Sequence, residues 1–206
     1  MSSVITGDEC WVYACDPETK QMSSQWNTAS SLRRKKARQV KSNVKTMLMA
    51  FFDINGLVHH KYVSREQTVY KKFYKTALQR LRDAVRRHRP EKWRFGNWIL
   101  LHDNAPAQRA VTTNEFLAKH NIPSLPHPPY SPDLAPCNFF LSPQLKKTMK
   151  DRRFGYVEEI QANATRQLSA ITKVTTRGAF VSGRNAGISA YKHKDTTSKE
   201  TRPTGR

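Results

Sequence analysis

Acidic residues are scarce in this chain. Of its 206 residues, 36 are Lys or Arg and only 16 are Asp or Glu, which gives a formal net charge of +20. A charge this large opposes compactness and favours a polyanionic partner, most often a nucleic acid. The alternative is a basic protein of ribosomal type, but the composition favours DNA or RNA binding.

Cysteine and long apolar runs are lacking as well. The cysteines Cys10, Cys15 and Cys137 show neither metal-ligand spacing nor a disulfide framework, so we expect free thiols in a reducing compartment. No apolar stretch reaches the roughly 18 residues that a membrane-spanning helix needs. The first residues also lack the charged and apolar regions of a secretory signal. A hydrophobic content of 37% is enough for one core and predicts a single domain.

The apolar pattern predicts an α/β fold with a mixed sheet flanked by helices. Residues 4–13, 46–52 and 57–63 have the character of strands, and Asn55-Gly56 is typical of a hairpin turn. From residue 68, apolar residues recur at helical spacing on a helix with a basic outer face, which Pro90 ends. The other expected elements are a short strand near Trp26, a strand at 98–102, an extended segment at 122–126, and helices at about 108–120, 139–150 and 158–171.

The last part of the chain differs in composition. Residues 173–206 are rich in Thr, Ser, Gly, Lys and Arg and have almost no apolar periodicity. Such segments bury too little apolar surface to fold. We therefore expect one domain at 1–172 and a disordered basic tail at 173–206.

Three oxygen-bearing side chains carry the functional signal. Asp103 follows the apolar run 98–101, 34 residues separate it from Asn138, and Asp8 stands in the first predicted strand. Hard oxygen ligands held rigidly at strand ends suit Mg²⁺. A pair of such ions can activate an attacking oxygen and stabilise the leaving oxygen of a phosphoryl transfer. Each Asp alone would more often be a cap or turn residue, so the hypothesis depends on the whole set.

The motifs around these positions resemble the mariner-type transposases over roughly residues 4–170. The blocks that carry the resemblance are Thr6-Gly7-Asp8-Glu9, Leu100-Leu101-His102-Asp103-Asn104-Ala105-Pro106, Leu125-Pro126-His127-Pro128-Pro129-Tyr130-Ser131-Pro132-Asp133-Leu134-Ala135-Pro136 and Asp151-Arg152-Arg153-Phe154.

The resemblance implies a ribonuclease H-like fold in which Asp8, Asp103 and Asn138 are the catalytic and metal-binding positions. It also implies Mg²⁺ or Mn²⁺ as cofactor in a two-metal site. Because the third charge is missing, we expect only one of the two ions to be held. Double-stranded DNA is the implied partner, in a homodimer with no small-molecule substrate. Members of the family cut the DNA ends of their element and join them to a target, so the expected activity is that of an endonuclease in DNA transposition and integration.

The chain departs from the family at the third acid, where Asn138 keeps a carbonyl oxygen but has no charge. At an effective dielectric near 20, a pair of unit charges at about 4 Å contributes about 4 kcal/mol. Even after screening by water, the loss predicts a rate reduced roughly a hundredfold or more. Asp133 is the alternative third acid, but the family already carries an Asp there, which favours a loop role. We therefore expect a weak or inactive enzyme; the alternatives are a non-enzymatic basic DNA-binding module and a decayed transposon product.

Two other family regions have no counterpart among these residues. The helix-turn-helix region that precedes the catalytic core in the family is missing, so we expect weak recognition of terminal repeats. The family's Trp-rich end is not continued after residue 175, as if the reading frame had shifted.

Basic and polar residues near the motifs are the expected DNA contacts. The run at 33–38 is either a nuclear address, which would give a nuclear localisation, or a phosphate-contacting loop. His102 is also expected to orient the Asp103 loop, and His59 and His60 to lie on the hairpin surface. The expected DNA-binding residues are Arg33, Arg34, Lys35, Lys36, Arg38, His102, Asn104, Lys146, Lys147, Arg152 and Arg153.

Overall fold

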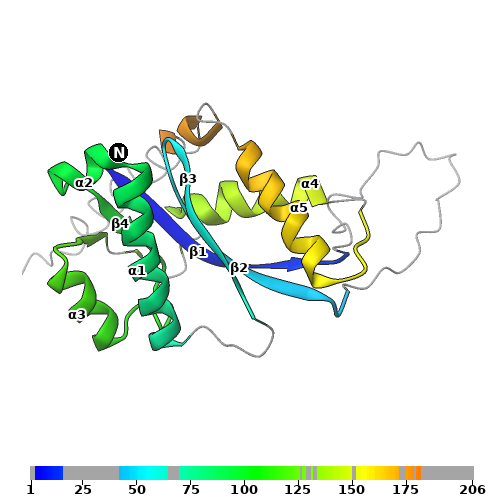
Figure 1. Cartoon of the computed structure of the whole chain (residues 1–206), viewed down its shortest axis with the longest axis horizontal. Coiled ribbons are helices and arrows are strands. Elements are labelled where there is room, and N and C mark those ends of the chain that lie inside the picture. Colours follow the sequence, from blue (N-terminus) through cyan, green and yellow to red (C-terminus); the bar gives the residue numbers. More distant parts are fainter. Residues whose placement is uncertain are drawn as a thin grey trace, which may run out of the picture.

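A computed structural model describes residues 3–15, 42–64, 70–125, 127–128, 131, 134–149, 152–171, 175–178 and 180–181. In these residues a five-stranded sheet of order β3-β2-β1-β4-β5 lies between two groups of helices (Figure 1). The predicted mixed sheet with helices on its flanks is confirmed. The strand predicted near Trp26 and the basic run 33–38 lie outside the described residues.

The sheet is built on its central strand. β1 (Val4–Tyr13) pairs antiparallel with β2 (Lys45–Asp53) and parallel with β4 (Ile99–Leu101). β2 continues through the predicted hairpin into β3 (Gly56–Val63), and Gly56 has a φ of 109°, which the turn requires and only glycine adopts readily. β5 (Ser124–Leu125) adds a parallel partner to β4.

The helices agree in order with the prediction, with one addition at Pro90. Proline both stops the helix before it and is well tolerated as the first residue of a new one. The sequence reading used only the first effect and so missed α2. The helical elements are α1 (Lys71–His88), α2 (Pro90–Phe95), α3 (Val111–Lys119), the π-helical turn η2 (Cys137–Leu141), α4 (Ser142–Met149) and α5 (Val157–Ala170).

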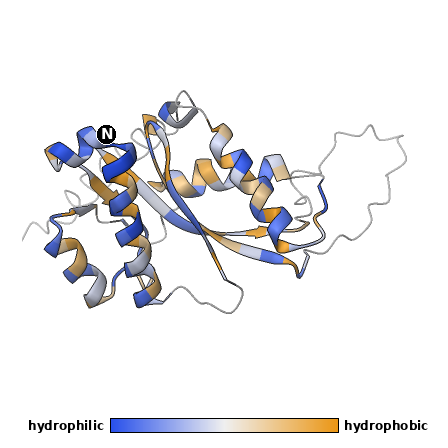
Figure 2. Cartoon of the chain, in the orientation of Figure 1, coloured by the Kyte–Doolittle hydropathy of each residue, from blue (hydrophilic) through white to orange (hydrophobic). Residues whose placement is uncertain are grey.

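Each face of the sheet has its own apolar core. Side chains alternate along β1, so Ile5 packs in the core beneath α1 and α3, whereas Val4 packs in the core beneath α4 and α5. The helices are striped with apolar and hydrophilic residues (Figure 2). Each fully buried Leu, such as Leu81 or Leu168, contributes about 1.5–3 kcal/mol. Two-sided burial therefore holds β1 rigidly.

A buried ion-pair group closes the end of the sheet where β2 turns into β3. The Asp53 carboxylate is fully buried; it accepts a hydrogen bond from Arg89 Nε at 2.9 Å and forms an ion pair with Lys92 Nζ at 2.7 Å. Burial raises the pKa of Asp53, but the hydrogen bonds and charges of Arg89 and Lys92 outweigh it and leave the pKa below its usual range. The group fastens the junction of α1 and α2 to the sheet.

The folded part extends past the predicted boundary at residue 172. Thr176 donates its hydroxyl to the backbone oxygen of Ile54 at 2.9 Å. Phe180 is buried and meets Phe52 edge-on, with ring centroids 5.6 Å apart. A single aromatic residue without periodicity gave no helical signal, which explains the misplaced boundary. The disorder expected for 182–206 concerns residues outside the described part. Among the described helices, none has the length and apolar character needed to cross a membrane.

Candidate metal-binding active site

The short length of β4 brings Asp103 beside Asp8. Thr6 pairs with Leu101, the last residue of β4, so the chain that continues to Asp103 runs alongside Asp8. The edge of β1 that β4 leaves uncovered is therefore where the acids gather. One carboxylate oxygen from each of Asp8, Glu9 and Asp103 lies within 4.8 Å of the others.

Gly7, just before the first acid, is required by packing. A Cβ at this position would overlap the ring of Phe51, which is buried beneath it on β2. Phe51 in turn stacks on His59, with ring centroids 6.4 Å apart. The hairpin histidine His59 is thus half-buried rather than a surface residue, which corrects the expectation. The close approach of Phe51 fixes the backbone that carries Asp8.

Backbone N–H groups fix both aspartates. Asp103 Oδ1 accepts from the Ala105 N–H at 3.0 Å, and Asp8 Oδ1 accepts from the Glu9 N–H at 2.8 Å. A side chain that bonds to the backbone a residue or two ahead has few alternative rotamers. The backbone therefore holds one oxygen of each aspartate in place.

A contact between β1 and η2 places Asn138 at the same site. The Thr6 hydroxyl and the Cys137 thiol, both buried, lie 3.7 Å apart. They precede Asp8 by two residues and Asn138 by one, so the contact aligns the two segments. A hydrogen bond from the Asn138 side chain lowers the pKa of Asp8. The structure thus brings together all three positions that the sequence reading selected.

The acidic side chains of the site raise one another's pKa. Burial, and then the charge of Asp103, raises the pKa of Asp8 to about 6. Burial and the charges of Asp8 and Asp103 raise the pKa of Glu9 to about 7. Oxygen donors that repel one another this closely are the donor set that Mg²⁺ or Mn²⁺ takes. The residues present therefore fit a divalent cation.

Glu9 and Gln108 were not selected from the sequence. Glu9 follows Asp8 in a strand, so alternation predicts that it points to the opposite face and away from the acids. In the structure it accepts a hydrogen bond from Gln108 Nε2 at 3.2 Å. Gln108 is only 1% exposed, and it lies on the loop that also carries Asp103. Glu9 is part of the Thr-Gly-Asp-Glu block, but its approach to the other acids depends on the early end of β4, which the sequence did not predict.

His102, which was expected to orient the Asp103 loop, is held in place by Tyr74. Its Nδ1 lies 2.9 Å from the hydroxyl of the buried Tyr74, and the two rings stack. Burial lowers the pKa of His102, although the neighbouring Asp103 raises it. On the other side of Asp103, the exposed Asn104 donates Nδ2 to the backbone oxygen of His127 at 2.6 Å.

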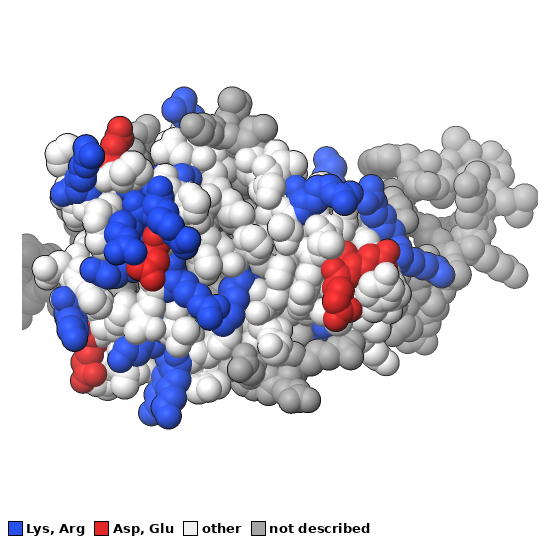
Figure 3. All heavy atoms as spheres, viewed as in Figure 1, with Lys and Arg blue, Asp and Glu red and all other residues white. Residues whose placement is uncertain are grey.

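The remaining expected DNA contacts are solvent-facing where the structure describes them. Lys146 and Lys147 are exposed on α4, and Arg152 and Arg153 are exposed before α5. Arg152 donates Nη1 to Asn163 Oδ1 at 3.2 Å. Lys and Arg also gather over α1 (Figure 3). The exposed basic residues of α1 are Lys71, Lys72, Lys75, Arg80, Arg86 and Arg87.

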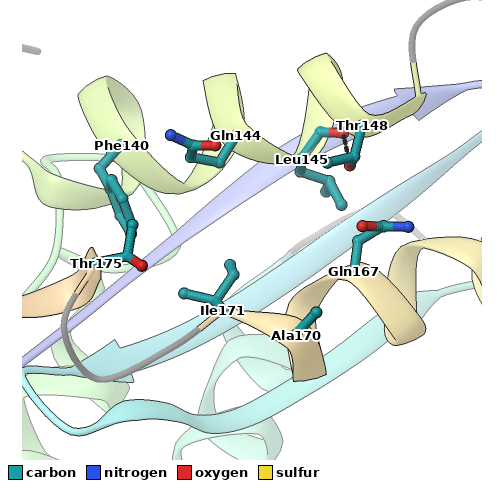
Figure 4. Close-up of a pocket in the computed structure, with 8 residues that line it drawn as sticks. All are labelled: Phe140, Gln144, Leu145, Thr148, Gln167, Ala170, Ile171 and Thr175. Carbon is teal, nitrogen blue, oxygen red and sulfur yellow. Dashed lines mark hydrogen bonds between the residues drawn. The ribbon is translucent and has the colours of Figure 1, made fainter.

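A hollow between α4 and α5 is a separate feature of about 160 Å³ (Figure 4). Its lining includes Phe140, Gln144, Thr148, Gln167 and Ile171, and it contains no ionisable side chain. It therefore offers neither charge for a metal nor cations for a phosphate. The chemistry belongs to the acids at the β1–β4 edge.

The sheet order and the acids at its central edge define a ribonuclease H-like domain of the transposase and nuclease class. The crystal structure of the catalytic domain of Mos1 mariner transposase superposes with a TM-score of 0.70 at 26% identity, covering 86% of this chain and 75% of that one. A pre-cleavage Mos1 transpososome gives a TM-score of 0.76 at 27% identity, covering 86% of this chain and 52% of that one.

Sequence comparison leads to the same family. Residues 16–95 match the family described as Transposase (partial DDE domain). The chain is 32% identical over 159 residues to the Mariner Mos1 transposase of Drosophila mauritiana, covering 77% of this chain and 45% of the relative. It is 26% identical over 154 residues to the histone-lysine N-methyltransferase SETMAR of Homo sapiens, covering 75% of this chain and 22% of that relative. Together with the structural matches, these similarities support a catalytic domain of the mariner transposase family, and the chain spans less than half the length of these relatives.

Proposed function

We propose that this chain binds double-stranded DNA and cleaves its strands in a reaction that depends on Mg²⁺ or Mn²⁺. The observation that carries the proposal is the cluster of carboxylate oxygens from Asp8, Glu9 and Asp103, which lie within 4.8 Å of one another, with Asn138 beside Asp8. The solved structures of Mos1 include its catalytic domain with Raltegravir and Mn, and the same domain with Raltegravir and Mg.

The roles of the side chains follow from their positions. Asp8 and Asp103 would hold the cation, which would activate the attacking oxygen and stabilise the leaving oxygen. Tyr74 holds His102 by a hydrogen bond of 2.9 Å, and so keeps the Asp103 loop in place. Gly7 allows the close packing that sets the backbone at Asp8.

Asn138 makes the proposed reaction slow. Its side chain lies beside Asp8, whose pKa it lowers, and it adds no negative charge, so a cation on that side of the site would lack a carboxylate ligand. A charge-assisted contact is roughly twice as strong as a neutral one. We propose that Asp8 and Asp103 would still hold one ion, and that a second ion would be held weakly because Asn138 has no charge.

The basic surface supplies the affinity for DNA. Lys and Arg contacts with phosphates dominate nucleic-acid affinity and carry little sequence information. The exposed Lys146, Lys147, Arg152 and Arg153 and the outer face of α1 are the proposed contacts. Mos1 has been solved as a paired-end complex with Mn and as a strand transfer complex. Integration by strand joining, a homodimer and a nuclear location are part of the proposal for this chain.

A second function, a DNA-binding module without catalysis, is favoured by the net charge of +20 together with the neutral Asn138. Nicking of supercoiled plasmid in Mn²⁺ separates the two. The first function predicts slow nicking that EDTA and Asp103→Ala both abolish. If neither the wild type nor Asn138→Asp cleaves, while DNA binding survives Asp8→Ala, the module is the correct account.

A further inference from the structure

We infer that Glu9 is a third carboxylate ligand of the cation held by Asp8 and Asp103, and that Gln108 positions it. The inference depends on the proposed function, because it completes the same site. It assigns a ligand that the Asp8, Asp103 and Asn138 set does not contain. With Glu9, one ion would have three carboxylate ligands. A second ion would still lack the negative charge that is missing at Asn138.

The first argument is the geometry of the open edge. Alternation turns Glu9 toward the α1 and α3 side of the sheet and Asp8 toward the α4 and α5 side. If a strand were paired with β1 at this edge, it would lie between the carboxylates of Asp8 and Glu9 on the two faces of the sheet. Because β4 ends opposite Thr6, nothing in the sheet lies between them at this edge, and both reach the Asp103 oxygen within 4.8 Å.

The second argument is the environment of Gln108. This side chain is 1% exposed, and its amide is directed at Glu9, to which Nε2 donates at 3.2 Å. Gln108 Oε1 and Glu9 Oε1 are both buried, and neither has a hydrogen-bond partner in the described part of the chain. A buried polar atom without a partner costs about 1–3 kcal/mol. The two unpaired oxygens belong to side chains that are hydrogen-bonded to each other, and they favour a cationic or hydrogen-donating group beside this pair.

A purely structural role for Glu9 explains less. A carboxylate that served only to hold Gln108 would not need to lie within 4.8 Å of two other acids. Like charges this close are unfavourable, and either a bound cation or a proton on one carboxyl group relieves the repulsion. The hydrogen bond from Gln108 instead keeps Glu9 at the cluster and prevents it from turning out to solvent.

The test is Mn²⁺ binding in the absence of DNA. Binding is measured by the EPR signal of free Mn²⁺, and the melting temperature is measured with Mn²⁺ and with EDTA. Four proteins are compared: wild type, Glu9→Gln, Asp103→Asn, and Glu115→Gln as a control on the exposed face of α3. Glu9→Gln keeps the shape of the side chain and removes its charge. We expect it to weaken Mn²⁺ binding at least about tenfold, the lower end of what losing even a ligand's hydrogen-bond partner costs.

The melting temperatures provide the second readout. Removing one of three mutually repelling carboxylates should raise the melting temperature of Glu9→Gln in EDTA and reduce the rise that Mn²⁺ produces. A residue with only a structural role would lower the melting temperature in both conditions. Glu9→Asp, which keeps the charge on a shorter side chain, should bind Mn²⁺ better than Glu9→Gln, and this comparison is made between folded proteins.

The outcomes separate this inference from the proposed function. If Asp103→Asn loses Mn²⁺ and Glu9→Gln binds like the wild type, the cation is held without Glu9 and the inference is wrong, while the proposed function stands. If the wild type binds no Mn²⁺ and also fails to nick DNA, both are wrong. Loss of binding in both variants, with Glu115→Gln unchanged, supports the inference.

Discussion

At the scale of single residues, the site depends on which neighbours each acid has. Asp8 is held by the Glu9 N–H and meets the amide of Asn138, whereas Asp103 is held by its own loop. Gly7 matters as much as the acids, because the ring of Phe51 occupies the space of its missing Cβ. The position of Asp8 thus depends on the neighbouring glycine, which the packing of Phe51 requires.

Gly7→Ala should destabilise the fold. The new methyl group must displace Phe51, which is buried and cannot move without disturbing its stack on His59. Overpacking of this kind costs about 1–3 kcal/mol, measured as the free energy of unfolding in urea. Gly178→Ala is the matched control, since nothing lies within 4 Å of the added Cβ and the change should be neutral or slightly stabilising. Equal stability of Gly7→Ala and the wild type would contradict the packing account.

Gln108→Met tests the positioning role at the same scale. The substitution keeps the length of the side chain but removes the amide that donates to Glu9 at 3.2 Å. Mn²⁺ affinity should fall several-fold, by less than in Glu9→Gln, because the carboxylate is retained but no longer held. Unchanged Mn²⁺ affinity in a folded Gln108→Met protein would show that the amide does not position Glu9.

At the scale of elements, the end of β4 and the junction of α1 and α2 determine the architecture. The strands, the hairpin and α1 could be predicted because each has a clear period or turn signal. Neither the early end of β4 nor the second helix after Pro90 has a local signal, since each depends on pairing and packing with distant segments. The same reason separates the site residues: Asp8, Asp103 and Asn138 have motif spacing, while Glu9, Gln108 and Tyr74 are defined only by contacts across elements.

Asp53→Asn should loosen the junction of α1 and α2. It leaves Arg89 and Lys92 beside a buried site without a negative charge, and breaking a buried ion pair costs about 3–5 kcal/mol. Asp83→Asn, which alters an exposed pair with Arg86, is the control and should change stability little. A difference between these variants below about 1 kcal/mol in denaturant unfolding would be inconsistent with the ion-pair group.

The same ion-pair group predicts a pH dependence. The pKa of Asp53 is lower in the folded chain than its usual value of 3.8. Its contribution to stability is therefore fully present above pH 3.8 and is lost as the pH falls through the lowered folded pKa. The stability gap between wild type and Asp53→Asn should be constant near neutral pH and shrink below about pH 4. A gap that widens on acidification would reverse the assigned sign.

At the scale of the whole molecule, the excess of basic residues defines the partner. Lys and Arg gather over α1 and on the side of α4 and α5 (Figure 3), and the net charge is +20. Replacing both Lys146 and Lys147 by Ala should weaken DNA binding and reduce the slope of log K against log salt by about 1.8, at about 0.9 per phosphate contact. Gln144→Ala on the exposed side of the same helix should leave the slope unchanged. An unaltered slope in the double variant would show that Lys146 and Lys147 do not contact the DNA phosphates.

The central claim is that the acids at the β1–β4 edge form a metal-dependent DNA-cleaving site that lacks one charge at Asn138. The most direct measurement is the initial rate of plasmid nicking in Mn²⁺ by Asn138→Asp relative to the wild type, with Asp103→Ala in each background. Restoring the carboxylate should raise the rate roughly a hundredfold, equivalent to about 2.7 kcal/mol, and Asp103→Ala should abolish it. The absence of cleavage by Asn138→Asp, in a folded protein that binds DNA, would contradict the account.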